Sequence, residues 1–266
     1  MLEIPVNSTP PLRALVCGST QGIGRATAQL LATQGTQVTL LARNESALDD
    51  VLGELAPVTG GTHKRLVGDF SKPEELQQRV AEFIAAEGPH NILINNTGGP
   101  PGGPVHTAAP EAFRSALDMH VVCNQLLVQT LLSGMKETGY GRVVNIISTS
   151  VYEPIPNLGV SNTTRAAVAG WAKTLSKELG SFGITVNNVL PGFTATGRLD
   201  KIIDTRATKT GNSKDKVAEG MRALVPLGRF AEAEEVAAAV AFLASPAASY
   251  INGVSLPVDG GRLNSI

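Results

Sequence analysis

The chain has 266 residues, of which 42% are hydrophobic and 17% are charged, with a formal net charge of -1 at pH 7. These values predict one folded domain with a sizeable core and exclude a disordered chain, which combines low hydrophobicity with high charge. The 22 Lys and Arg residues are balanced by 23 Asp and Glu residues, so there is no basic excess for binding nucleic acid or an anionic membrane surface.

The first residues, Met1 to Pro11, show no basic start followed by an apolar run, and no stretch reaches the ~18 apolar residues of a membrane span. We therefore expect a cytoplasmic protein. Cys17 and Cys123 have no CxxC or His-rich companion, which predicts buried free thiols and neither a disulfide nor a metal site.

Short apolar runs alternate with longer helical segments along the chain, which is typical of parallel βαβ units. The expected strands are Leu12–Cys17, Gln37–Ala42, Lys64–Val67, Ile92–Asn95, Arg142–Ile147, Thr185–Leu190 and Ser255–Val258. The expected helices are Ile23–Gln34, Glu45–Leu55, Pro73–Ala86, Pro110–Met135, Asn162–Leu179 and Glu232–Leu243. Several strands are apolar throughout, which indicates helices on both faces of the sheet. The sequence predicts a single-domain, doubly wound α/β fold of the Rossmann type with a core over 11–261.

Two stretches break this alternation, the Gly/Pro-rich Gly98–Pro104 and the polar Gly197–Leu224. Both follow strand ends, where open α/β sheets bind their ligands. Long loops in a compact domain tend to be functional, so we interpret 197–224 as a segment that covers the substrate.

A glycine motif, Gly18-Ser19-Thr20-Gln21-Gly22-Ile23-Gly24, directly follows the first strand and opens the first helix. Glycines in this place permit a tight turn and a close backbone approach, while the helix N-terminus offers free N–H groups to a pyrophosphate. The motif therefore predicts a dinucleotide site.

Arg43 stands at the end of the second strand, where a carboxylate would bind the ribose 2′-hydroxyl of NAD and an arginine accommodates the 2′-phosphate of NADP. Glu45, two residues on, keeps NAD open as the alternative. The position of Arg43 favours NADP(H).

Further motifs follow the later strands: Asp69 after the third, Asn95-Asn96-Thr97-Gly98 after the fourth, Pro191-Gly192 after the sixth, and Val258-Asp259-Gly260-Gly261 near the end. With the glycine motif, this ordered set resembles the short-chain dehydrogenase/reductase family from about Pro11 to Gly261. Within the family the chain is most similar to the 3-oxoacyl-acyl-carrier-protein reductases.

The resemblance implies that Asp69 lies near adenine, Asn95 and Gly98 near the adenosine ribose, Pro191, Gly192 and Thr194 beside the nicotinamide, and Thr196 at the pyrophosphate. All expected cofactor-binding residues are Gly18, Ser19, Gln21, Gly22, Ile23, Gly24, Arg43, Asp69, Phe70, Asn95, Asn96, Thr97, Gly98, Asn145, Ile146, Arg165, Pro191, Gly192, Thr194 and Thr196.

The catalytic positions depart from the family, whose members use a serine, a Tyr-x-x-x-Lys pair and an asparagine on the preceding long helix. Ser148 stands where the serine belongs. Ser161 replaces the tyrosine, Arg165 replaces the lysine, and His120 stands at the place of the asparagine.

Reduction of a ketone needs a hydride and a proton for the developing alkoxide. Ser161 is a poor acid, and Arg165 keeps the positive charge and can hydrogen-bond the nicotinamide ribose but does not readily pass protons. His120 and Tyr152 are the alternative donors, although a hydrogen-bonded helix residue and a pocket wall are their more ordinary interpretations. Ser148 is expected to hold the substrate carbonyl.

Two functions follow. The first is an NADPH-dependent carbonyl reductase acting on 3-oxoacyl thioesters of acyl-carrier protein or coenzyme A, which the retained Ser148, Asn145 and Pro191-Gly192 favour. The second is a catalytically degenerate NADP(H)-binding protein with a regulatory or scaffolding role. The last strand and two long helices resemble those at the family's interfaces, so we expect a homotetramer, with a homodimer as the alternative.

Overall fold

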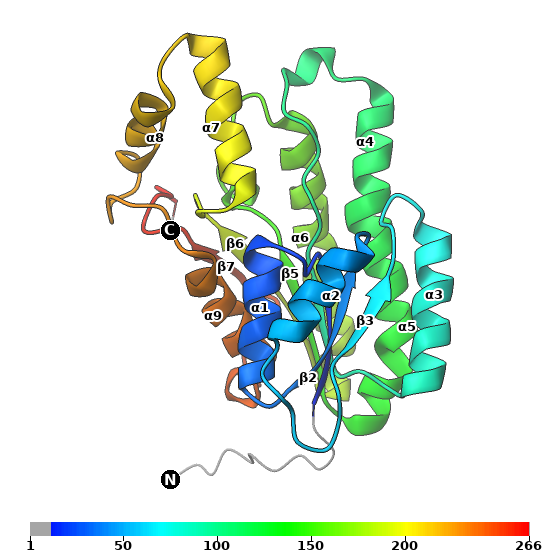
Figure 1. The fold of residues 1–266 in the computed structure, drawn as a ribbon. Helices are drawn as coiled ribbons and strands as arrows, with labels where there is room; N and C mark the ends of the chain where they lie inside the picture. Colours follow the sequence, from blue (N-terminus) through cyan, green and yellow to red (C-terminus); the bar gives the residue numbers. More distant parts are fainter. Residues whose placement is uncertain (1–11, 266) are drawn as a thin grey trace.

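The computed structural model describes residues 12–265, so the segment Met1 to Pro11 lies outside the described residues. Seven parallel strands form one sheet in the order β3-β2-β1-β4-β5-β6-β7 (Figure 1). The strands are β1 Arg13–Cys17, β2 Gln37–Ala42, β3 Lys64–Val67, β4 Ile92–Asn95, β5 Gly141–Ile146, β6 Ile184–Pro191 and β7 Ser255–Val258. The predicted doubly wound fold is confirmed, and each expected strand is present to within one residue at either end.

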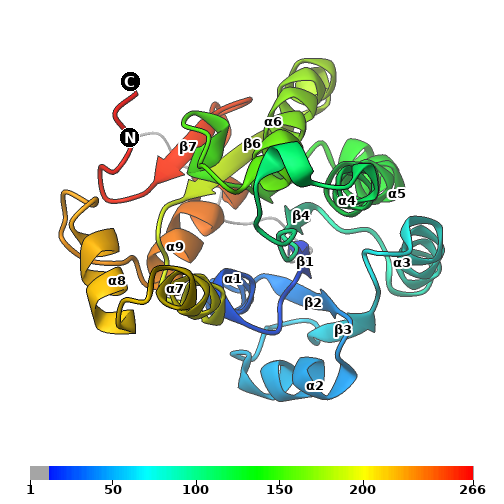
Figure 2. The ribbon, with the colours of Figure 1, turned by 90° about the horizontal axis from the view of Figure 1, so that it is seen from above.

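Helices cover both faces of the sheet, as the apolar strands predict. They are α1 Gly22–Thr33, α2 Glu45–Glu54, α3 Pro73–Glu87, α4 Pro110–Leu117, α5 Cys123–Thr138, α6 Gly159–Leu179, α7 Gly197–Thr210, α8 Lys214–Arg222 and α9 Ala233–Ala244. Figure 2 shows α1, α2 and α9 on one face and α3, α5 and α6 on the other. Buried side chains accordingly form two main clusters, one on each side of the strands. Cys17 and Cys123 are buried free thiols, as predicted.

The chain adds β2 and β3 on one side of β1 and then β4 to β7 on the other side, so the strand order reverses at β1, which pairs with both β2 and β4. At such a switch point the loops that leave the two strands diverge and open a crevice at the carboxyl ends. The loops after β1 and β4 carry the glycine motif and Asn95 to Gly98, so both predicted cofactor segments lie at this point.

The helix expected over Pro110–Met135 is interrupted, which corrects the sequence-based prediction. Asp118–Val122 forms a π-helical turn between α4 and α5, in which the N–H of Cys123 bonds to the carbonyl of Asp118. A π turn inserts one extra residue into a helix and shifts the side chains that follow it, often at a functional site. Here the turn contains His120.

The polar segment Gly197–Leu224 is also different from the expectation of a long loop, because it folds into α7 and α8. Leu199, Ile203 and Ala207 recur every fourth residue and are buried, and Leu199 and Ile203 pack with Met221 of α8. This small apolar stripe supports two otherwise polar helices, which extend beyond the carboxyl edge of the sheet (Figure 1). Between residues 12 and 265, no helix is both long and apolar enough to span a membrane.

Candidate active site

The glycine loop after β1 has the geometry of a phosphate cradle. Gly18 and Gly22 adopt positive φ values of 59° and 53°, which disfavour any other residue. A Cβ on Gly24 would collide with the carbonyl oxygen of Gly18. The side chain of Gln21 does not cap α1, so the first N–H groups of this helix are left for a ligand. The loop therefore fits the pyrophosphate of a dinucleotide.

Two more distant residues fix this loop. The amide of Asn96 donates to the carbonyls of Cys17 at 3.3 Å and Gly18 at 3.2 Å, so Asn96 shapes the cradle from the end of β4. Thr196 lies on the other side, where its methyl group would be 3.1 Å from a Cβ on Gly22. Thr196 thus lies against the glycine loop.

Arg43 and Asp69 are the residues predicted to bind the adenosine part of the cofactor. Arg43 is exposed at the end of β2. The pKa of Asp69 is lowered, first by a hydrogen bond from the Ser71 N–H and further by the positive charge of Arg43. Phe70, in contrast, packs its side chain into a core cluster.

A row of polar side chains crosses four strands of the sheet and was not predicted. Asn95 donates to Asn145 at 2.8 Å, Asn145 donates to Asn188 at 2.9 Å, and Asn188 donates to Ser255 at 3.0 Å. These residues are direct partners in the strand register. We call the three asparagines together with Ser255 the asparagine row. The three asparagines are buried. The signal in the sequence was the asparagine in each of three largely apolar strands, with two adjacent ones, Asn187 and Asn188, in β6.

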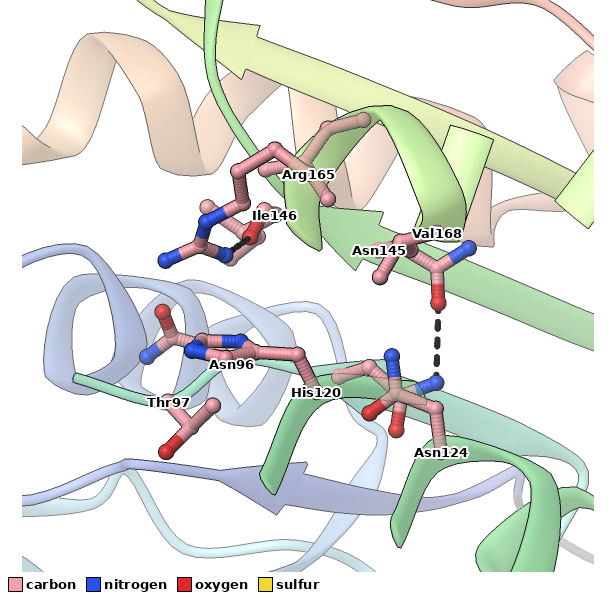
Figure 3. A pocket seen from close by; sticks show the side chains of 10 residues that line it. Asn96, Thr97, His120, Asn124, Asn145, Ile146, Arg165 and Val168 are labelled. Atoms are coloured by element: carbon pink, nitrogen blue, oxygen red, sulfur yellow. Dashed lines mark hydrogen bonds between the residues drawn. The ribbon is translucent and has the colours of Figure 1, made fainter. Parts of the chain in front are cut away.

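One end of this row opens into a cavity of about 10 Å³. The sequence predicted seven of its lining residues, namely Asn95, Asn96, Thr97, His120, Asn145, Ile146 and Arg165. It missed Asn124, Ile147 and Val168, which face the cavity from α5, the end of β5 and α6. In Figure 3, Arg165 and His120 enter from opposite sides. The Oδ1 atom of Asn95 and the Nε2 atom of His120 have no hydrogen-bond partner among residues 12–265.

The electrostatics of this cavity are set by Arg165. Its side chain is 8% exposed and donates to the Ile146 carbonyl at 3.0 Å. The pKa of His120 is lowered to about 3, mainly by burial and also by the charge of Arg165, while the Gly98 backbone acts in the opposite direction. His120 is therefore a neutral imidazole near pH 7, and this weighs against it as a charged acid.

The other predicted catalytic residues, Ser148, Ser161 and Tyr152, are not among the residues that line the cavity. Ser148 lies two residues after β5 and its Oγ accepts a 3.1 Å hydrogen bond from the Ser150 N–H, which leaves the Ser148 hydroxyl proton free. Ser161 lies one turn before Arg165 on α6. Tyr152 is 47% exposed, and its hydroxyl donates to the Ser255 carbonyl at 3.0 Å.

Two buried histidines predict how stability depends on pH. Burial lowers the pKa of His120 to about 3 and that of His90 to about 4, from 6.5. The unfolded chain therefore takes up these protons first, so stability is complete above pH 6.5 and falls as the pH drops toward 4. From pH 7 to pH 5 we expect each histidine to lower the free energy of unfolding by about 2 kcal/mol.

Urea unfolding at the two pH values measures this loss. In His90→Gln the loss between pH 7 and pH 5 should be about 2 kcal/mol smaller than in the parent. The control is His106→Gln, since His106 is exposed. An unchanged pH dependence in His90→Gln would contradict the assignment.

The fold and this site define a class of protein. A doubly wound sheet with a glycine cradle at its switch point, an arginine after β2 and a polar cavity beside the cradle is a dinucleotide-binding domain of oxidoreductase type. No group of three His, Cys, Asp or Glu side chains that could hold a metal ion occurs in the described range 12–265.

Comparison with known proteins gives the family. A family profile described as Enoyl-(Acyl carrier protein) reductase matches residues 18–262. The chain belongs to the short-chain dehydrogenase/reductase family, as its motifs predicted.

Its relatives carry different activities. The 3-oxoacyl-(acyl-carrier-protein) reductase FabG of Vibrio cholerae is 34% identical over 250 residues, covering 93% of this chain and 96% of FabG. The NADPH-dependent reductase BacG of Bacillus subtilis is 34% identical over 265 residues, covering 95% and 98%. The structure of L-sorbose reductase from Gluconobacter frateurii, complexed with NADPH and L-sorbose, has a TM-score of 0.90 at 28% identity, covering 96% and 98%.

Proposed function

We propose that this chain is an NADP(H)-dependent reductase that acts on carbonyl compounds. The observation that carries the proposal is the glycine cradle, because a side chain on Gly24 would fill the space and the first N–H groups of α1 remain available. Relatives and solved neighbours described as using NADPH support this cofactor. The 3-oxoacyl thioesters of acyl-carrier protein or coenzyme A are the first substrates to test, since FabG enzymes are among the relatives.

Different residues of this chain would bind the cofactor and the substrate carbonyl. NADPH, when bound, supplies a hydride from its nicotinamide. Arg165 would hydrogen-bond the nicotinamide ribose, and Pro191, Gly192 and Thr194 would border the ring. Ser148 would donate its hydroxyl proton in a hydrogen bond to the substrate carbonyl, where negative charge develops. The atypical pair Ser161 and Arg165 provides a cation without an ordinary acid, so the final proton comes from His120, from Tyr152 or from water.

A second candidate is a catalytically degenerate NADP(H)-binding protein with a regulatory or scaffolding role. The observation that favours it is the state of the two alternative donors. His120 is neutral, and the Tyr152 hydroxyl is already bonded to a backbone carbonyl.

An NADPH oxidation assay over a panel of 3-oxoacyl thioesters, ketones and quinones separates the two candidates. A turnover that saturates with one of these classes supports the reductase. Tight NADPH binding without turnover on any of them supports the degenerate protein. The homotetramer, or failing that the homodimer, and the cytoplasmic location remain parts of the proposal.

The cofactor preference gives a direct prediction. The parent should bind NADPH more tightly than NADH, and Arg43→Ala should lower this preference about 10-fold, because a charge-assisted hydrogen bond to the 2′-phosphate is lost. Calorimetry with both cofactors measures the two affinities. Equal affinities in the parent would reject the role of Arg43.

A further inference from the structure

Two guanidinium groups face the same small space at the carboxyl edge of the sheet. Arg165 reaches it from α6, and Arg198 reaches it from the first turn of α7. A Cβ on Gly99 would lie 3.3 Å from Nη2 of Arg198 and 3.6 Å from Nη2 of Arg165. Both positive charges therefore border one point beside Gly99, and the absent side chain of this glycine leaves room between them.

Neither charge is balanced by the protein. In the part of the chain that the structure describes, no carboxylate forms an ion pair with Arg165 or Arg198. The pKa of Arg165 is lowered to about 10, first by burial and then by the charge of Arg198. The two cations thus repel each other, and an anion between them would remove this repulsion.

Arg165 also has unused hydrogen-bonding capacity. A guanidinium carries five N–H donors. The hydrogen bond from its Nη1 to the Ile146 carbonyl is the one that it makes among residues 12–265, and its Nη2 atom lies near Gly99 instead. A charged group that is 92% buried is stable only when its charge and donors are satisfied. The nicotinamide ribose proposed above for Arg165 would take up some of these donors, but it is neutral and leaves the charge unbalanced, so this arrangement points to an anionic ligand.

Arg198 occupies an electrostatically unfavourable position. It lies in the first turn of α7, where the helix dipole is already positive. The acidic residue of that turn, Asp200, acts on Lys214. The Nη2 atom of Arg198 donates to the neutral carbonyl of Pro100 at 3.1 Å. An anionic acceptor would bind this exposed guanidinium more strongly than a carbonyl does.

We propose that Arg165 and Arg198 together bind a carboxylate of the substrate, which makes this protein a reductase of oxo acids. The inference rests on the proposed reductase function and replaces the thioester with a free oxo acid as the substrate class. The two planar oxygens of a carboxylate match the donor geometry of guanidinium groups. Arg198 is thus a specificity-determining residue of the proposed reaction.

The position of this pair favours the substrate over the cofactor phosphates. Pro100 belongs to a loop that is hydrogen-bonded to the residues just before α6, since the Gly103 N–H donates to the Asn157 carbonyl at 2.8 Å. Ser161 lies in the first turn of that helix. The phosphates have their own donors at the N-terminus of α1.

Calorimetry on the protein loaded with NADP+, which has no hydride to transfer, tests the inference with acetoacetate and its neutral analogue acetoacetamide. The parent should bind acetoacetate roughly 10-fold more tightly than acetoacetamide, as expected for a charge-assisted hydrogen bond. Arg198→Met should abolish this preference, and Arg198→Lys should retain part of it. Arg206→Met, two turns further along α7, is the matched control and should behave as the parent. Thermal unfolding of each variant verifies that it is folded.

Three results would overturn the inference: a parent that does not bind acetoacetate, equal binding of the two compounds by the parent, or an unchanged preference in Arg198→Met. The last result together with weakened NADPH binding would assign Arg198 to the cofactor phosphates. Because binding is measured with NADP+ and reduction is assayed separately with NADPH, the failure of the reductase function is distinguishable. Charge-selective binding without reduction would support this inference and reject the reductase, whereas reduction without charge selectivity would do the opposite.

Discussion

Replacing Ser148 with alanine is expected to lower the rate of hydride transfer by about 10²–10³-fold, as the loss of one donor to a developing oxyanion does. The Ser148 Oγ is held by the N–H of Ser150 at 3.1 Å, so its hydroxyl proton is available to the substrate. Single-turnover measurements at saturating NADPH isolate this step, and separate titrations of the cofactor keep binding losses out of the comparison.

The same measurement compares the remaining candidates. His120→Gln and Tyr152→Phe should cause much smaller losses, because one side chain is neutral and the other is bonded to the Ser255 carbonyl. Ser161→Ala is the control, because the Ser161 hydroxyl on α6 is not expected to donate the proton to the alkoxide. A loss of about 10²–10⁴-fold in either the His120 or the Tyr152 variant would identify that residue as the proton donor. A Ser161→Ala variant that is folded, binds NADPH and is inactive would overturn this interpretation of the site.

The second large effect concerns the cradle. Gly24→Ala should weaken NADPH binding by about 10–100-fold, because the new methyl group meets the Gly18 carbonyl and the Asn96 amide and displaces the loop at a cost of ~1–3 kcal/mol. The affinity is measured by calorimetry on a variant whose thermal unfolding shows that it is folded.

Gly53→Ala is the matched control, since Gly53 lies in α2 and an added Cβ there would meet no atom within 4 Å outside its chain neighbours and the backbone of its own helix. It should bind NADPH as the parent does and be slightly more stable, because alanine favours a helix over glycine by ~1 kcal/mol. A Gly24→Ala variant that retains the affinity of the parent would show that the cofactor does not approach this loop closely.

The sequence predicted the fold well because its strands are short apolar runs between clear turn signals, and a parallel arrangement follows from the helices between them. It was misleading over Gly197–Leu224, where the charged residues of α7 and α8 conceal a narrow stripe of Leu199, Ile203 and Ala207. The π turn at Asp118–Val122 has no sequence signal, because its hydrogen bond depends on tertiary packing.

The site was predicted in part. The glycine motif, Arg43 and the residues around His120 and Arg165 were identifiable because each follows a strand end or stands at a position of a known motif. Arg198 was not, since only the folded α7 brings it next to Arg165. Likewise, the sequence could not show that the hydroxyl of Tyr152 is bonded to β7, a contact between residues 103 positions apart.

The asparagine row has a consequence for how the chain reaches its native sheet. β4 to β7 are largely apolar, and such strands have little to distinguish the correct register from one shifted by a residue. In a shifted sheet, Asn95, Asn145 and Asn188 would no longer face one another, and buried amides would be left without partners. The asparagine row thus destabilises sheets with misaligned strands during folding. The correct register in turn aligns the carboxyl ends of these strands, from which the loops around the cavity begin.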